Sequence, residues 1–464
     1  MNAITDVIAA ISTPPGKGGV AVIRMSGMGA LDVMREVFVS KSGAFPEKVR
    51  PRVQNYGYVI DRGETVDDVL MTYFPAPNSY TGEDTVEISC HGGVLVTRTV
   101  LGVLLSHGAR AAEAGEFTRR AFLGGKLTLT EAEAIGNLLD AESRDQMRLS
   151  SEPSRKRLGE SIEKIRAGLV SVMSSLYARI DYPDEDLGDL DDDEIIEMLS
   201  ACKSATHSLL TTYRTGKAIC DGVRTVIVGR PNVGKSSLYN LLLGEDSAIV
   251  TDIAGTTRDV LERSVPLGKV MLRLADTAGI RESESMDAVE RIGIAKSREK
   301  LDNCELIFAL FDISEDLTED DVRLLSIIDG SKSPKIALLN KSDKPHKISD
   351  SDLGIRFDRV IEISTTDPSA RSIDELTEAV EELFVDGSIT VGTDAVISSE
   401  RQRASLERTE ALIESAIDAL RLGVPQDAIS GDVERAIGAV AELDGRAVAE
   451  EIVSDIFKHF CVGK

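Results

Sequence analysis

Hydrophobic residues along the chain follow two different periods, and the change from one to the other divides the chain into segments. Residues 1–120 contain short apolar runs such as "VAVIRMSG" and "VEISCHGG", separated by glycine and proline. Apolar runs of this length, bounded by turn-forming residues, are typical of β-strands. This segment therefore predicts an α+β domain.

From about residue 128 onward the pattern changes, and apolar positions recur at alternating steps of three and four, which places one apolar stripe along a helix. The first series is Ile162, Ile165, Leu169, Val172 and Leu176. The same period returns near the C-terminus in Ile413, Ile417 and Leu420, then in Val448, Ile452, Ile456 and Phe460. We therefore expect a helical domain in two parts, 121–220 and 384–464.

The segment between these parts, 221–383, has a third pattern. It contains the strand-like runs "RTVIVG", "VMLRLAD", "ELIFALFD", "KIALLN" and "VIEIS", separated by polar stretches of helix length. Continuous apolar strands that alternate with helices indicate a parallel sheet covered on both faces. The expected fold class is multidomain α/β and α, with a parallel-rich α/β domain inserted into the helical domain.

Composition narrows the cellular setting. A chain of 464 residues with 42% hydrophobic residues is too long for a single hydrophobic core, so several domains are expected. Its five cysteines form no CxxC pair, which indicates neither a disulfide framework nor a zinc site. No apolar run is long enough to cross a bilayer, and the start lacks signal-peptide features. We expect a cytoplasmic protein without membrane contact.

The formal net charge of −25 argues against broad, sequence-independent nucleic-acid binding. Such binding depends on lysine and arginine neutralising phosphates. If RNA is the substrate, a partner is expected to supply much of the positive surface.

A phosphate-binding loop follows the first strand of the inserted segment. The stretch "GRPNVGKSS" satisfies G-x-x-x-x-G-K-[ST] between a strand and a helix. Its backbone N–H groups can wrap phosphates, Lys235 can reach the β and γ oxygens, and the Ser236 hydroxyl can bind Mg²⁺. The nucleotide contacts expected in this loop are Asn232, Val233, Gly234, Lys235, Ser236 and Ser237.

Further motifs follow in the order that a GTPase needs. "GTTRD" offers Thr257 as a second Mg²⁺ ligand, and "DTAG" supplies Asp276, Thr277, Ala278 and Gly279 on the metal and γ-phosphate side. "NKSD" contains Asn340, Lys341 and Asp343, whose carboxylate can accept hydrogen bonds from N1 and N2 of guanine. "ISTTD" offers Ser364, with Thr365 where such proteins often have alanine. Together the motifs specify GTP.

The position after "DTAG" is Ile280, whose apolar side chain cannot orient a water molecule as the glutamine of Ras-like proteins does. Glu290 in "DAVERIGI" is close enough in sequence to take that role, although on physical grounds alone it is also explained as a surface carboxylate. Arg258 fits either an arginine finger or a solvent-exposed residue.

At this point the residues resemble one family, the tRNA modification GTPases MnmE, also called TrmE. The resemblance runs end to end and includes "IAAISTPPGKGGVAVIRMSG", "PNSYTGEDTVEISCHGG" and the closing "FCVGK". Members act on the wobble uridine, position 34, of certain tRNAs. The resemblance implies G domains that pair face to face, Glu290 as the residue that orients water, and a potassium ion held by Asn232, Thr251, Ile253 and Thr256, of which Thr251 and Thr256 also contact GTP.

The resemblance also implies the role of the N-terminal segment 1–120. It is expected to be a dimerisation domain that makes the protein a homodimer and binds 5-formyl- or methylene-tetrahydrofolate through Arg24, Glu87, Lys126 and Lys464. Without the resemblance, Arg24 and Glu87 are best interpreted as an ion pair between strands. Cations can meet the folate carboxylates, and an acid can meet the N–H groups of the pterin.

Cys461 lies in the C-terminal "FCVGK", which in the family reaches back toward the folate pocket. Two readings remain open. As a thiolate, Cys461 would suit nucleophilic work on the one-carbon unit. Alternatively, it is a small hydrophobic residue that fits a tight turn.

The resemblance finally implies a partner. This is a flavin protein like MnmG (GidA) that carries FAD, forms a heterotetramer with the chain and helps convert the uridine to its (carboxymethyl)aminomethyl form at C5. One rival is an Era-type regulatory or ribosome-assembly GTPase that modifies no base. A second is a folate-dependent aminomethyltransferase with an accessory G domain, which would turn over without GTP.

Overall fold

The computed structural model describes residues 6–46, 48–181, 191–243, 263–274, 303–366 and 370–446, and, of the C-terminal segment, 453, 456–458, 460, 462 and 463. The chain divides into two compact units, residues 1–139 with 437–464 and residues 140–436. Within the described ranges, no helix combines the length and apolar character needed to cross a membrane.

The first unit is built on a seven-stranded sheet in the order β3-β4-β5-β6-β2-β1-β7. Neighbouring strands are antiparallel except β1 and β7, which run parallel. The strands are β1 (Val7–Ile11), β2 (Val20–Ser26), β3 (Phe38–Ser40), β4 (Gln54–Asp61), β5 (Glu64–Phe74), β6 (Thr85–His91) and β7 (Ala109–Ala111).

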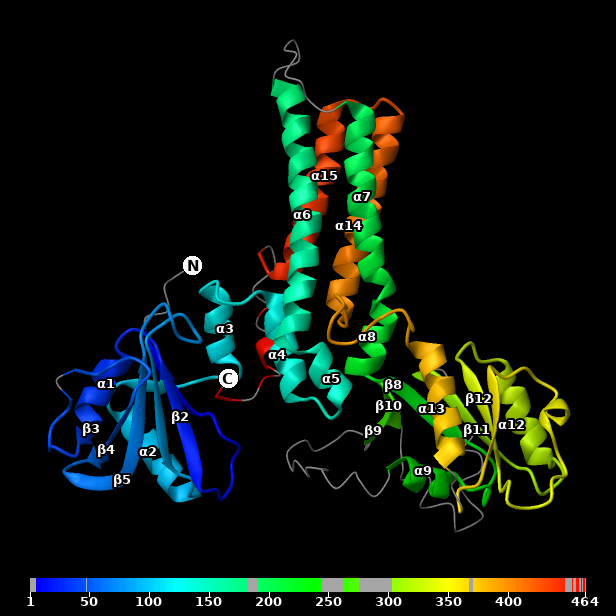
Figure 1. Cartoon of the computed structure of the whole chain (residues 1–464), viewed down its shortest axis with the longest axis horizontal. Coiled ribbons are helices and arrows are strands. Elements are labelled where there is room, and N and C mark those ends of the chain that lie inside the picture. Colours follow the sequence, from blue (N-terminus) through cyan, green and yellow to red (C-terminus); the bar gives the residue numbers. More distant parts are fainter. Residues whose placement is uncertain are drawn as a thin grey trace. The chain divides into compact units, whose positions relative to one another are not determined.

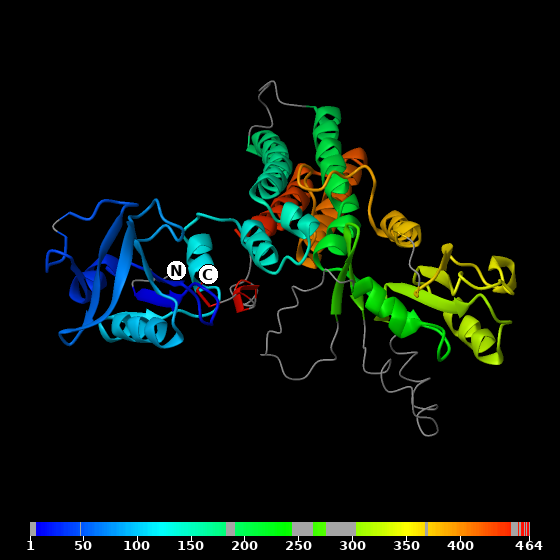
Figure 2. The ribbon, with the colours of Figure 1, turned by 60° about the horizontal axis from the view of Figure 1, so that its bottom comes forward.

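Helices cover the sheet of the first unit and confirm the predicted α+β domain. Ile23 and Ile88 of the sheet are fully buried in one core with Met34 of α1 and Leu104 of α2. Figure 2 shows α2 lying along the sheet. The helices are α1 (Ala30–Val37), α2 (Val94–Ser106), α3 (Glu116–Leu123) and α4 (Leu129–Leu139).

The second unit contains long helices that pack side by side, α6 against α7 and α7 against α14 (Figure 1). All five positions of the predicted stripe, from Ile162 to Leu176, are buried on α6, and so are Ile413, Ile417 and Leu420 on α14. The helices are α5 (Arg144–Leu149), α6 (Glu152–Asp181), α7 (Asp192–Thr211), α8 (Tyr213–Cys220) and α14 (Glu400–Arg421), while α15 (Gln426–Asp444) crosses the boundary between the units.

The inserted segment forms a six-stranded sheet in the order β13-β12-β11-β8-β10-β9. Every pairing is parallel except that of β9 with β10, so all five predicted runs form the parallel part. The edge strand β9 was not predicted, because Pro266 interrupts its run and proline is confined to sheet edges. The strands are β8 (Val223–Val228), β9 (Arg263–Leu267), β10 (Val270–Leu274), β11 (Leu306–Asp312), β12 (Lys335–Asn340) and β13 (Arg359–Ile363).

Helices lie on both faces of this sheet, as predicted. On one face Leu238 of α9 and Leu376 of α13 share a core with Phe308. On the other, Leu325 and Ile328 of α12 pack with Phe311. The helices are α9 (Lys235–Leu243), α12 (Glu319–Asp329) and α13 (Ala370–Phe384), with a 3-10 turn at Asp350–Asp352.

A buried arginine joins separate segments of the first unit. The Arg120 side chain is only 1% exposed and pairs with Asp6 (2.8 Å), Glu116 (3.0 Å) and Glu83 (3.2 Å). Burial acts to raise the pKa of Glu116, but hydrogen bonds from Arg110 and Arg120 outweigh it and lower that pKa below its usual value. The neighbouring guanidinium groups thus favour the charged form of Glu116 and likewise lower the pKa of Asp6.

Replacing Arg120 with methionine should destabilise the first unit, because Asp6, Glu83 and Glu116 lose a buried cation. Breaking a buried pair in this way costs about 3 kcal/mol. Hydrogen exchange of the β1 and β7 amides in the full chain measures the loss. Arg35→Met, which removes a guanidinium paired with Asp32 at the surface, is the control and should leave the exchange unchanged. Equal protection in the two variants would contradict this expectation.

Candidate functional site

The predicted phosphate loop joins β8 to α9 and is shaped by two residues in the left-handed region. Asn232 has φ +62° and Gly234 has φ +110°. A Cβ atom built on Gly234 would come within 2.1 Å of the Asn340 side-chain nitrogen. Only glycine fits here, because both the backbone angle and the contact exclude a side chain.

Lys235 folds back over the loop that precedes it. Its Nζ donates to the carbonyl oxygens of Gly229 and Arg230, both at 2.8 Å. Burial lowers the pKa of this ammonium. Since the N–H groups of the first helical turn have no intrahelical acceptor, the start of α9 and Lys235 together form a place for phosphate oxygens.

Asn340 connects the phosphate loop to the loop that follows β13. It ends β12, is 1% exposed, and its Nδ2 donates to the carbonyl oxygen of Val233 at 2.7 Å. Its Oδ1 accepts from the backbone N–H of Thr365 at 3.1 Å, and its Nδ2 also lies 3.2 Å from the Thr365 hydroxyl. The threonine found in place of the usual alanine thus takes part in the network.

Asp343 and Ser364 lie together at the same edge. The Ser364 hydroxyl donates to Asp343 Oδ1 at 2.7 Å, and this hydrogen bond is the main cause that lowers the pKa of Asp343. Asp343 is therefore an ionised, exposed carboxylate at the carboxyl end of the strands. Such a group can accept two neighbouring N–H donors of a purine edge.

Asp312 belongs to this network but was not predicted from the sequence. The ammonium of Lys341 pairs with Asp312, the last residue of β11, whose side chain is 1% exposed. The signal was a carboxylate closing a fully buried apolar run, "LIFALFD". Buried acids rarely occur without a cationic partner.

Other predicted residues lie outside the described part of the chain. They are Thr251, Ile253, Thr256, Thr257, Arg258, Asp276, Thr277, Ala278, Gly279, Ile280, Glu290, Cys461 and Lys464. Of the predicted nucleotide contacts, the structure brings Asn232, Val233, Gly234, Lys235, Ser236, Ser237, Asn340, Lys341, Asp343 and Ser364 to the carboxyl edge of one sheet.

Arg24 and Glu87 form the ion pair that residue chemistry alone predicted. They stand opposite each other on β2 and β6, and Arg24 Nη2 lies 2.8 Å from Glu87 Oε1. The guanidinium also lies 5.4 Å from the ring centre of Tyr80 and 5.8 Å from that of Phe117. Charge and aromatic rings thus meet on the sheet of the first unit.

Two more segments of the first unit contain predicted folate contacts or lie next to them in sequence. Lys126 Nζ donates to the carbonyl oxygen of Pro77 at 3.0 Å. The carbonyl oxygen of Gly463 accepts from the Ser12 hydroxyl at 3.0 Å, and a Cβ on Gly463 would come within 2.3 Å of the Ile11 carbonyl oxygen. The described end of the chain therefore packs beside β1, the strand next to the one that bears Arg24.

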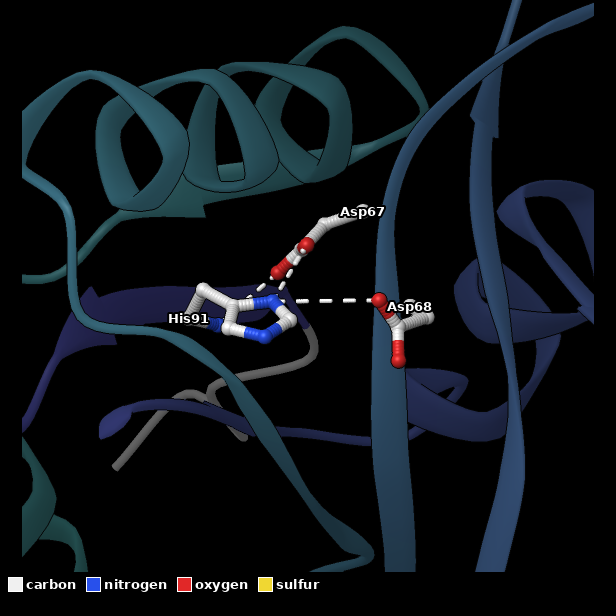
Figure 3. A group of neighbouring side chains, drawn as sticks. All are labelled: Asp67, Asp68 and His91. Atoms are coloured by element: carbon white, nitrogen blue, oxygen red, sulfur yellow. Dashed lines mark hydrogen bonds and ion pairs between the residues drawn. The ribbon is translucent and has the colours of Figure 1, made fainter. Parts of the chain in front are cut away.

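A separate group on the first unit joins His91, the last residue of β6, to two acids within β5. His91 Nδ1 lies 2.7 Å from Asp67 Oδ1 and 3.8 Å from Asp68 Oδ1, and Asp67 also accepts from the His91 backbone N–H at 2.8 Å (Figure 3). The hydrogen bond to Asp67 is the main cause that raises the pKa of His91. The spacing would admit a metal ion, but the hydrogen bonds between His91 and Asp67 already account for the contacts.

Comparison with known proteins identifies the family of this chain. The chain matches the model "GTP-binding protein TrmE N-terminus" over residues 7–126 and the model "MnmE helical domain" over residues 129–461. It is 40% identical over 469 residues to the tRNA modification GTPase MnmE of Heliobacterium modesticaldum, covering 99% of this chain and 100% of that one. It is 38% identical over 463 residues to the MnmE of Natranaerobius thermophilus, covering 99% of each.

These matches run over both units and include the nucleotide motifs placed above. The chain belongs to the MnmE family and is a GTPase that acts in tRNA modification.

Proposed function

We propose that this GTPase is potassium-dependent and, with a flavin partner, modifies C5 of the wobble uridine of tRNA to (carboxymethyl)aminomethyluridine. The one-carbon unit would come from methylene-tetrahydrofolate. The observation that carries the nucleotide part is the network in which Asn340 links the phosphate loop to the segment that holds Asp343. It joins a phosphate site and a purine-edge acceptor at one sheet edge.

In this proposal GTP lies with its phosphates at the start of α9 and its base at Asp343. Ser236 and Thr257 would bind Mg²⁺, which neutralises charge on the phosphates. Asn232, Thr251, Ile253 and Thr256 would hold K⁺, and Glu290 would orient the attacking water. The exposed position of Asn232 and Ser236 supports their access to ions.

The folate part of the proposal rests on the first unit. Arg24 and Glu87 offer a cation and an acid, Tyr80 and Phe117 offer apolar rings, and Lys126 offers a second cation. These groups suit a pteridine ring with a glutamate tail. The packing of Gly463 beside β1 supports a role for the terminal Lys464 and Cys461 in the same region.

The partner part of the proposal rests on charge. A net charge of −25 disfavours binding of tRNA phosphates by the chain alone. A homodimer that joins an MnmG-like FAD protein in a cytoplasmic heterotetramer would gain the positive surface that it lacks. Hydrolysis of GTP would then open and close the G domains and gate the modification.

The rival with no base modification is an Era-type regulatory GTPase. It shares the phosphate loop and the guanine motif, but it does not require the paired charges and rings around Arg24. Family membership and those residues favour the modification function. A folate-dependent transferase that ignores GTP would differ from both, because it would turn over without nucleotide.

Asp343→Asn should exchange guanine preference for xanthine preference. The asparagine amide no longer accepts both N–H groups of guanine, but it can donate to the oxygen that xanthine carries at C2. The GDP affinity should fall about 100-fold, as expected when charged hydrogen bonds are lost. Titration with mant-GDP and mant-XDP measures both affinities. Asp352→Asn, which alters an acid that accepts from Ser349, is the control. Unchanged GDP binding by Asp343→Asn would refute the base contact.

Arg24→Met should weaken binding of 5-formyltetrahydrofolate about tenfold, since it removes one charged hydrogen bond and its contact with the rings. Isothermal titration of the full chain measures this affinity. Arg35→Met removes a surface arginine of the same unit and should bind like the wild type. The folate proposal fails if the wild-type chain shows no binding at all.

Cells lacking the protein should lose 5-aminomethyl-type wobble uridines, as measured by mass spectrometry of nucleosides from bulk tRNA. The full chain should restore them, whereas Glu290→Ala and a chain ending before Cys461 should not. An unchanged profile in the deficient cells would favour the Era-type rival. Full restoration by a hydrolysis-deficient Glu290→Ala protein would overturn the coupling of hydrolysis to modification.

A further inference from the structure

Asp312 occupies a central place in the nucleotide-binding edge without belonging to any motif. It ends β11, which lies between β8, the strand that leads to the phosphate loop, and β12, the strand that ends in Asn340. In the register of the sheet Asp312 stands directly opposite Asn340. Its side chain is 1% exposed, so this carboxylate is almost completely removed from water.

Both carboxylate oxygens of Asp312 are engaged. Oδ1 accepts from the backbone N–H of Ser314 at 3.0 Å and from its hydroxyl at 2.6 Å. Oδ2 accepts from Lys341 Nζ, and Arg230 Nη2 of the phosphate loop lies 3.8 Å away. Burial acts to raise the pKa of Asp312, but the hydrogen bonds from Lys341 and Ser314 outweigh burial and lower it. Asp312 is thus a buried anion between two loop cations.

The backbone of Lys341 adopts an unfavourable conformation. Its φ of +67° lies in the left-handed region, which costs free energy for a residue with a side chain. The conformation turns the chain sharply between Asn340, which holds the phosphate loop, and Asp343, which holds Ser364. The ammonium held by Asp312 is a contact that offsets this cost.

Arg230, the second cation near Asp312, is itself held by other acids. Arg230 Nη2 donates to Glu315 Oε2 at 2.5 Å, and its Nε lies 3.5 Å from Asp321 Oδ2 on α12. These acids hold Arg230 without contributing a hydrogen bond to Lys341. Among these acids, Asp312 is therefore the one that pairs both with Arg230 of the phosphate loop and with Lys341 of the loop after β12.

We propose that Asp312 is a positioning residue for the guanine nucleotide: it holds in place Lys341, one of the predicted nucleotide contacts. The inference rests on the proposed base contact at Asn340–Asp343 and adds to it a buried acid that acts through Lys341. Loss of the acid leaves the lysine free to move, so bound nucleotide dissociates faster.

A double-mutant cycle on the full chain tests the proposal. The measurement is the dissociation rate of mant-GDP by stopped flow for wild type, Asp312→Asn, Lys341→Met and the double variant. Asp312→Asn should raise the rate about tenfold, the effect of losing one charged hydrogen bond. The double variant should match Lys341→Met within about twofold, because Asp312 acts only through the lysine. Two effects that multiply would overturn the proposal.

Controls separate this role from a general loss of stability. Glu305→Gln removes a partly buried carboxylate that pairs with Lys217 just before the amino end of β11, at the opposite edge of the sheet, and should leave the rate unchanged. If Asp312→Asn does not fold, Ser314→Ala loosens the same carboxylate without removing its charge. It should raise the rate in the wild-type background and have no effect in the Lys341→Met background, and equal effects in the two backgrounds would overturn the proposal.

The failure of this inference can be told apart from failure of the proposed function. If Asp343→Asn keeps full affinity for GDP, the base contact itself is wrong. If Asp343→Asn loses affinity while Asp312→Asn dissociates at the wild-type rate, the base contact stands and the positioning role of Asp312 is wrong.

Discussion

The nucleotide site depends on the double contact that the Asn340 amide makes at the carboxyl end of β12. One side of the amide holds Val233 in the phosphate loop, and both sides hold Thr365 in the loop after β13. Asn340 is buried and its bond to Val233 is removed from water, so losing that bond would leave a buried carbonyl oxygen unsatisfied. Gly234 is glycine because this amide occupies the space of its side chain.

Charge is organised around buried ions in both units. In the first unit one arginine, Arg120, serves three carboxylates. In the second, one carboxylate, Asp312, lies between Lys341 and Arg230. Such ions contribute little net stability compared with apolar residues, but they hold segments in one arrangement because leaving a partner unpaired is costly. In the nucleotide-binding unit, this fixes the positions of Lys341 and Arg230, which matters more for binding than a gain in stability.

Much of the fold could be predicted because its elements are specified locally. The apolar residues from Ile162 to Leu176 all fall on one face of a helix, which is then the buried face. Runs such as "LIFALFD" are apolar on both faces, which suits a parallel strand covered by helices on both sides. β9 escaped prediction because its five residues contain Pro266 and its pairing with β10 is what makes it a strand. Edge strands carry weak signals for this reason.

The sequence by itself determined the phosphate loop, the guanine motif and the residue types of both candidate sites, since these signals are short stretches whose spacing carries the chemistry. Only the tertiary structure decided that Asp312 meets Lys341, that Thr365 satisfies Asn340, and that Gly463 packs beside Ile11. These contacts join residues 25 to more than 400 positions apart. The physical reason is that a contact across strands depends on sheet order and register, and these follow from how the whole chain buries its apolar faces.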